Sequence, residues 1–146
     1  MVIAGTLGII LARKGSAVWS ISPDATVFEA IQLMANKNVG ALPVEDNSRL
    51  IGIISERDYT RKVILKGLSS KDTAVRDIMT REMLTASPSD SIQDCMRVMT
   101  EKRVRHLPVL EGTKMIGIVS IGDVMEWVIS AQAEEIERYV TGDYLA

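Results

Sequence analysis

The sequence has one cysteine, one histidine and no apolar run long enough to span a bilayer. Cys95 has no partner for an internal disulfide, and His106 has no second histidine with which to hold a metal ion. Residues 1–11 are apolar, but they are too short for a transmembrane helix and lack the basic start of a signal peptide. We therefore expect residues 1–17 to form an N-terminal helix or arm of a cytoplasmic protein.

The chain also lacks an excess of either charge. Its 17 lysines and arginines are mixed with 19 aspartates and glutamates, which gives a net charge of −2. This distribution is not the basic surface that nucleic-acid binding normally requires. The sequence has no glycine-rich phosphate loop and no histidine paired with a nucleophile. We expect a protein that is not an enzyme and whose partners are neither nucleic acid nor membrane.

The sequence does contain a duplication. Residues 22–58 align with residues 87–123 at a constant shift of 65, without a gap, and 13 of the 37 pairs are identical. A repeat of this length indicates one small fold used twice. We divide the chain into repeat 1 (18–65), a linker (66–78), repeat 2 (79–129) and a C-terminal helix (130–146). Because about fifty residues bury little surface alone, we expect the repeats to pack on each other.

Each repeat shows the same order of elements. Val27, Ala30, Ile31 and Met34 have the spacing of one apolar helix face, and the second copy repeats it with Cys95 at the buried position of Ala30. Two short apolar runs around a polar turn then predict a hairpin, and a further helix follows. The predicted fold class is α+β: two pseudo-symmetric repeats, each with a small sheet packed against two helices.

The strand sequence Leu-Pro-Val and the ending Gly-Ile-x-Ser-x-x-Asp, both present twice, resemble the CBS domain. Two in tandem resemble the CBS pair, or Bateman module, over about residues 15–129. The resemblance implies a stand-alone, non-enzymatic sensor that binds an adenosine compound between the repeats. AMP is the first choice, with ADP, ATP, NAD and S-adenosylmethionine as others, and no metal is required. It also implies a homodimer, with a protein target that the sequence does not identify.

In the family, the motif aspartate holds the ribose hydroxyls and the serine three residues earlier lies near the phosphate. Here these residues are Asp58 with Ser55, and Asp123 with Ser120. A carboxylate accepts hydrogen bonds from both hydroxyls of a cis-diol, and the first turn of a helix favours a phosphate. Ser-x-x-Asp is also close to a capping box, in which the acid only caps the helix. Two matches at equivalent positions favour ligand binding, and the two roles can coexist.

The two repeats differ in charge. Arg105 and His106 precede the second Leu-Pro-Val, whereas Gly40 and Ala41 precede the first. The resemblance implies that basic residues here contact the ligand phosphate, which makes the second site the stronger candidate. Arg57 either supplies the charge that the first site lacks or is simply exposed. We expect one tight site and one weak or empty site.

The resemblance further implies that the segment leading into one repeat completes the site of the other. Lys14, a second phosphate contact or a free surface lysine, joins the Asp123 site, and Trp19 either walls the adenine or covers the core. The complete set of predicted ligand contacts is Lys14, Val18, Trp19, Val39, Gly40, Ala41, Ser55, Arg57, Asp58, Met79, Met83, Arg105, His106, Ser120, Gly122 and Asp123. The remaining alternatives are a structural dimerisation module with vestigial pockets and a nucleotide-acting enzyme.

Overall fold

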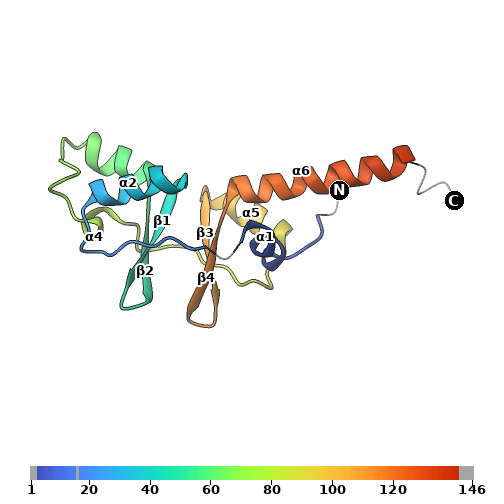
Figure 1. Cartoon of the computed structure of the whole chain (residues 1–146), viewed down its shortest axis with the longest axis horizontal. Helices are drawn as coiled ribbons and strands as arrows, with labels where there is room; N and C mark the ends of the chain where they lie inside the picture. The colour runs from blue at the N-terminus through green and yellow to red at the C-terminus, as the bar shows by residue number, and fades with distance from the viewer. Residues whose placement is uncertain (1–2, 16, 142–146) are drawn as a thin grey trace.

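The computed structural model describes residues 3–15 and 17–141 and consists of two similar halves side by side (Figure 1). The first half contains, in order, α2 (Val27–Lys37), β1 (Ala41–Asp46), β2 (Arg49–Ser55), α3 (Glu56–Tyr59), a π-helical turn (Thr60–Ile64) and α4 (Val75–Ile78). The second half contains α5 (Ile92–Lys102), β3 (His106–Glu111), β4 (Lys114–Ser120) and α6 (Ile121–Thr141). Helix α1 (Leu7–Lys14) precedes both. The predicted α+β class with two pseudo-symmetric repeats is confirmed.

The ends of the first helix in each repeat follow the duplication. Thr26 caps α2 by accepting from the Glu29 N–H at 3.1 Å, and Ser91, 65 residues later, caps α5 in the same way. Both helices end at a residue in the left-handed conformation, Asn38 with φ 55° and Arg103 with φ 54°. Capping residues at equivalent positions therefore give the two helices equal lengths.

Each sheet is an antiparallel hairpin extended by one parallel bridge. Strand β1 pairs with β2 and β3 with β4, while Ile21 bridges to Val44 and Ala86 bridges to Val109. The register shifts directly after Val44 and Val109, each of which follows the strand proline. Proline donates no backbone hydrogen bond, so an irregularity here agrees with the expected position of a proline at an edge or bulge.

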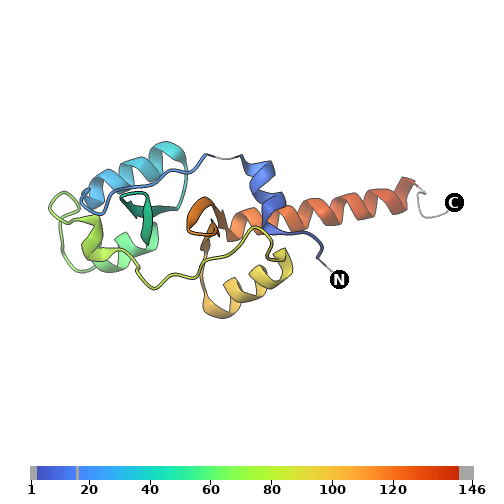
Figure 2. The same cartoon turned by 90° about the horizontal axis from the view of Figure 1, so that it is seen from below.

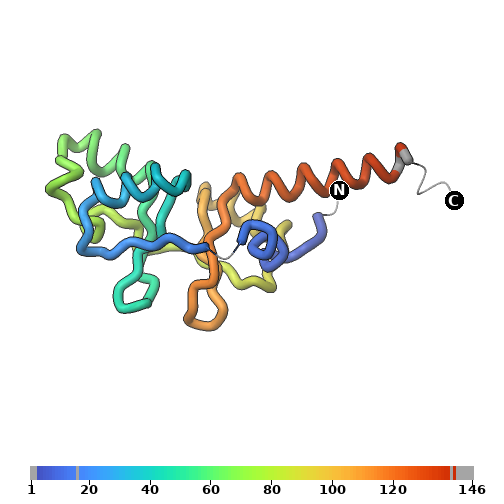
Figure 3. Tube along the Cα trace, in the orientation of Figure 1, coloured from blue at the N-terminus to red at the C-terminus, as the bar shows by residue number. Residues whose placement is uncertain are grey.

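The buried apolar side chains form two clusters, one in each half, and not one core shared between the repeats. Each cluster is completed by a helix from outside the duplicated segment. Leu7 and Ile10 of α1 are buried in the second half, and Val75 and Ile78 of α4 are buried in the first. After α1 the chain crosses from the second half to the first, where α2 begins (Figure 3). Mutual packing of the repeats is thus not what builds each core.

This arrangement gives two segments outside the repeats a place in a core. Residues 1–17, expected to form an N-terminal helix or arm, contain helix α1, which belongs to the second core and lies beside α6 (Figure 2). Residues 66–78, expected to be a linker, contain α4 of the first core. The physical reason is the small size of each repeat, which needs an additional apolar helix to close its core.

Two glycines permit the close approach of these added segments. A Cβ at Gly117 of β4 would lie 2.6 Å from Leu11 Cδ2 of α1. A Cβ at Gly52 of β2, the equivalent position, would lie 2.9 Å from Met79 Sδ and 3.0 Å from the Thr80 carbonyl oxygen. Any larger residue would push the added segment away from its strand.

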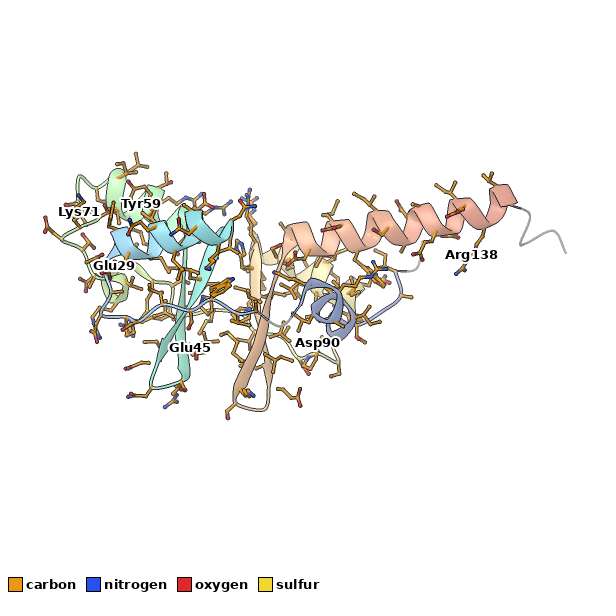
Figure 4. The ribbon with its side chains drawn as sticks, viewed as in Figure 1. Glu29, Glu45, Tyr59, Lys71, Asp90 and Arg138 are labelled. Atoms are coloured by element: carbon orange, nitrogen blue, oxygen red, sulfur yellow. The ribbon has the colours of Figure 1, made fainter. Side chains whose placement is uncertain are left out.

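Helix α6 is one continuous helix of 21 residues, where the sequence predicted a repeat helix and a separate C-terminal helix over 130–146. Residues 142–146 lie outside the described residues. Val124 and Val128 are buried against the second half, and the remainder projects past it, as the position of Arg138 shows (Figure 4). Within residues 3–15 and 17–141, no helix has the length and apolarity that crossing a bilayer requires.

Candidate ligand site at the two serine–aspartate turns

Strands β2 and β4 both end in a serine that caps the following helix. The Asp58 N–H donates to Ser55 Oγ at 3.1 Å, and Asp58 Oδ2 accepts from the Ser55 N–H at 2.9 Å. In the second repeat, the Asp123 N–H donates to Ser120 Oγ at 3.0 Å and Asp123 Oδ2 accepts from the Ser120 N–H at 2.9 Å. The capping interpretation is therefore correct for both turns. Ligand binding at an aspartate depends on the oxygens that capping leaves open.

Both carboxylate oxygens of Asp58 already have partners. Besides its backbone contact, Oδ2 accepts from Ser55 Oγ at 3.1 Å. Oδ1 accepts from Thr80 Oγ1 at 3.2 Å and lies 3.0 Å from the Lys62 ammonium. Asp58 is only 8% exposed. A sugar could bind here only by displacing these internal contacts.

Asp123 is more accessible. Its Oδ2 accepts from Lys14 Nζ at 2.7 Å in addition to the Ser120 N–H, while its Oδ1 accepts no hydrogen bond from the part of the chain that the structure describes. The side chain is 21% exposed, compared with 11% for Asp58. Burial raises the pKa of Asp123, but Lys14 and Ser120 outweigh burial, so the pKa lies below its ordinary 3.8. The carboxylate is ionised and has one oxygen open to a ligand.

Three charged groups act on His106. Burial lowers the pKa of His106 below its ordinary 6.5, and the charges of Lys14 and Arg105 lower it further, whereas Asp123 raises it. Lys14, Arg105 and Asp123 are therefore all within electrostatic reach of the imidazole. Arg105 is exposed, and its carbonyl accepts from the Ile121 N–H at 2.8 Å, which fixes its backbone beside the start of α6. The Asp123 carboxylate thus contacts one cation, Lys14, while His106 is influenced by both Lys14 and Arg105.

The lowered pKa of His106 predicts a pH-dependent stability. As pH falls below 6.5, the unfolded chain takes up a proton before folded His106 does, so the free energy of unfolding decreases. We expect the melting temperature to fall between pH 7 and pH 5.5, and His106→Gln to reduce this slope because the chain has no other histidine. Thermal unfolding followed by circular dichroism measures both. An unchanged slope in His106→Gln would show that imidazole burial does not control it.

The two repeats meet where Gly40 lies opposite His106. A Cβ at Gly40 would lie 3.2 Å from Glu56 Oε1 and 3.5 Å from His106 Nε2. The Glu56 N–H donates to the Gly40 carbonyl at 3.1 Å, as the Ile121 N–H does to Arg105 in the other repeat. Glycine at position 40 thus leaves room for the imidazole of the second repeat to approach the first.

The structure places the other predicted contacts in different environments. Trp19 is 42% exposed, with Lys37 Nζ 4.0 Å from the centre of its ring. Met79 is 7% exposed and packs in the first core, because Gly52 lets it approach β2, so its side chain does not offer the ligand surface that was expected. Of the remaining residues, Val18, Val39 and Met83 are half-buried, Ala41 is buried, and Arg57 and Gly122 are exposed.

The sequence interpretation missed the residues that satisfy Asp58. Arg57 was the candidate for the positive charge at this site, yet Lys62 supplies it, and its ammonium also donates to the Ile78 carbonyl at 2.9 Å. The spacing of Asp58 and Lys62 at i, i+4 on a predicted helix was a usable signal for this pair. No sequence signal pointed to Thr80, because its contact depends on how the segment after α4 packs against β2.

A small cavity of about 140 Å³ opens beside Asp123, between α1 and α6. Its lining includes Lys14, Trp127 and Ser130, but neither Arg105 nor His106. Within the described residues, no group of three or more His, Cys, Asp and Glu side chains is arranged to hold a metal ion. Cys95 is buried, and its burial together with Asp90 and Asp94 raises the pKa of its thiol, as for an unreactive core residue.

Comparison with known proteins gives consistent matches to one family. The CBS-domain family model matches residues 15–64 and 75–130. The chain is 45% identical over 141 residues to the mitochondrial CBS domain-containing protein CBSX3 of Arabidopsis thaliana, covering 91% of this chain and 68% of that protein. It is 33% identical over 107 residues to the CBS domain-containing protein YhcV of Bacillus subtilis, covering 73% and 76%.

A solved structure agrees with these matches. It is a putative signal-transduction protein with CBS domains from Burkholderia ambifaria, 46% identical, with a TM-score of 0.84 over 88% of this chain and 96% of that one. Two such folds, each ending in a serine–aspartate turn, define a tandem CBS pair, a class of regulatory modules. The chain belongs to the CBS-domain family, which confirms the resemblance drawn from its sequence motifs.

Proposed function

We propose that this protein is a non-enzymatic sensor that binds an adenosine-containing nucleotide between its two repeats and signals by a change of conformation. AMP is the expected ligand, with ADP, ATP and NAD as related candidates. Asp123 holds the ribose, while Arg105 and His106 contact the phosphate. The sensor works if the nucleotide has different affinities for two arrangements of the repeats, because only such a difference shifts their populations.

The observation that carries this proposal is the Asp123 carboxylate, whose Oδ2 accepts from Lys14 and whose Oδ1 accepts no hydrogen bond within the described residues, in a repeat where Lys14 and Arg105 both act on His106. An ionised carboxylate with a free oxygen is an acceptor for ribose hydroxyls, and the exposed guanidinium of Arg105 is a bidentate donor for a phosphate. The cavity beside Asp123, at about 140 Å³, is too small for a whole nucleotide. The base and phosphate therefore lie outside it, on the side of Arg105 and His106.

The alternative of a structural module with vestigial pockets has one observation in its favour. Asp58 is satisfied by Lys62 and Thr80, as the aspartate of a vestigial site would be. We assign this state to the first site only, so that the protein binds one nucleotide. We further propose that the protein is a cytoplasmic homodimer, for which the exposed Met125 and Ile129 of α6 provide apolar contact surface.

Titration calorimetry with AMP tests this function. We expect one AMP per chain, a higher melting temperature in saturating AMP because the nucleotide binds the folded state, and recovery of unchanged AMP afterwards. Adenosine compounds that copurify with the protein would be identified by mass spectrometry. No heat and no thermal shift with AMP, ADP, ATP or NAD would support the structural module, and conversion of the nucleotide would indicate an enzyme.

A further inference from the structure

Most of the exposed large apolar side chains lie on two surfaces, one in each half. Seven of the ten such side chains among the described residues belong to them: Ile64, Leu65 and Leu68 in the first half, and Met125, Ile129, Ile136 and Val140 on α6. The π-helical turn and α6 lie along the upper side of the molecule in Figure 1, opposite the tips of the two hairpins. Exposed apolar groups that gather in this way usually mark a contact with another molecule.

The surface of the first half is basic. Its three apolar side chains are between 50% and 74% exposed. Arg61 and Lys66 stand beside them in the sequence and are also exposed, and residues 59–71 include no acidic residue. Neither Arg61 nor Lys66 forms an ion pair with another residue that the structure describes. The basic surface is defined as Arg61, Ile64, Leu65, Lys66 and Leu68.

The surface on α6 is acidic. Its four apolar residues follow one another at intervals of four, seven and four positions, so they share one face of the helix. Glu126 and Glu137 each directly follow one of these residues, and both are exposed. The whole of α6 contains five acidic residues and one basic residue. The acidic surface is defined as Met125, Glu126, Ile129, Ile136, Glu137 and Val140.

We propose that the acidic surface of α6 packs on the basic surface of a second copy of this chain. The homodimer is then antiparallel, with the first half of one chain facing the second half of the other. This inference rests on the homodimer proposed above and specifies which surfaces meet. A two-fold axis that pairs one basic with one acidic surface also pairs the other two, so both apolar surfaces of each chain are covered. A parallel dimer would instead place like charges against each other, which is unfavourable.

Charge reversal tests this pairing. The basic-reversed variant carries Arg61→Glu and Lys66→Glu, the acid-reversed variant carries Glu126→Lys and Glu137→Lys, and the combined variant carries all four substitutions. Sedimentation equilibrium measures the dissociation constant of each dimer. We expect each reversed variant to raise this constant about tenfold or more, because like charges then face each other. We expect the combined variant to return to within about threefold of the wild-type chain, because opposite charges face each other again.

Arg49→Glu with Lys114→Glu is the matched control for the basic-reversed variant. Both residues are exposed at the hairpin tips, and the pair makes the same change in net charge. We expect this control to keep the wild-type dissociation constant. If it weakens the dimer as much as the basic-reversed variant does, the effect is one of net charge and the inference is overturned.

The other possible results separate this inference from the proposed function. Equal dissociation constants in the wild-type chain and all three reversed variants would indicate a parallel dimer or one built from other surfaces, and would overturn the inference while the homodimer stands. Failure of the combined variant to recover would overturn the charge pairing. A wild-type chain that stays monomeric would overturn the homodimer and this inference together, whereas AMP binding is tested independently by the calorimetry described above.

Discussion

Asp123→Ala is expected to weaken AMP binding about a hundredfold, whereas Asp58→Ala is expected to change it less than about threefold. The larger loss follows because Asp123 is ionised and its Oδ1 accepts no hydrogen bond within the described residues. Removing an acceptor of charge-assisted hydrogen bonds costs about 1.5–3 kcal/mol. The smaller loss follows because both oxygens of Asp58 are already engaged within the protein. Titration calorimetry of the two variants measures the difference.

The two substitutions control for each other. Each removes the acid of a capping box, at a cost of about 1 kcal/mol, and Asp58→Ala also removes the contacts with Thr80 and Lys62, so it is expected to be at least as destabilising as Asp123→Ala. A common loss of folding would therefore affect both variants, and the difference in AMP affinity reports on the ligand alone. Equal losses of affinity in the two variants would contradict the assignment of Asp123 as the main site.

Leu7→Ala is expected to lower the free energy of unfolding by about 3 kcal/mol, as deletion of a buried leucine side chain usually does. Leu7 is 0% exposed in the second core, although it stands in a segment for which the sequence left a helix and an arm both open. Ile9→Ala is the control in the same helix, because Ile9 is 42% exposed and its truncation should cost about 1 kcal/mol or less.

Urea unfolding of both variants, followed by circular dichroism, measures these energies. A larger loss for Leu7→Ala would show that α1 is part of the second core in solution. Small and equal losses in the two variants would mean that α1 is a separate arm, and Lys14 would then not be held beside Asp123. The packing of α1 and the position of Lys14 beside Asp123 are thus linked through one helix.

The duplicated motifs predicted the elements of each repeat well. The serine–aspartate turns occupy the positions that the pattern indicated, because caps and turns depend on residues within a few positions along the chain. The charge difference between Arg105-His106 and Gly40-Ala41 also distinguished the two sites before any fold was considered. The local pattern could not show which residues of the protein bind each carboxylate.

The partners of each carboxylate are residues far from it in the sequence. Lys14 lies 109 residues from Asp123, and Thr80 lies 22 residues from Asp58. Both contacts follow from the way α1 and the segment after α4 pack against a strand glycine, Gly117 or Gly52. A single sequence does not specify which of two similar cores an apolar helix completes.

The sequence by itself determined that one small fold occurs twice, where its helices and strands lie, and which two aspartates are candidates for a sugar. The tertiary structure alone decided that Asp58 is satisfied internally, that Asp123 keeps an open oxygen, and that Lys14 stands beside it. The physical reason is the distance along the chain between the residues that fix each feature. Helix caps and hairpins are fixed by neighbouring residues, whereas the partners of a half-buried charge are fixed by whichever distant segments the apolar cores bring against it.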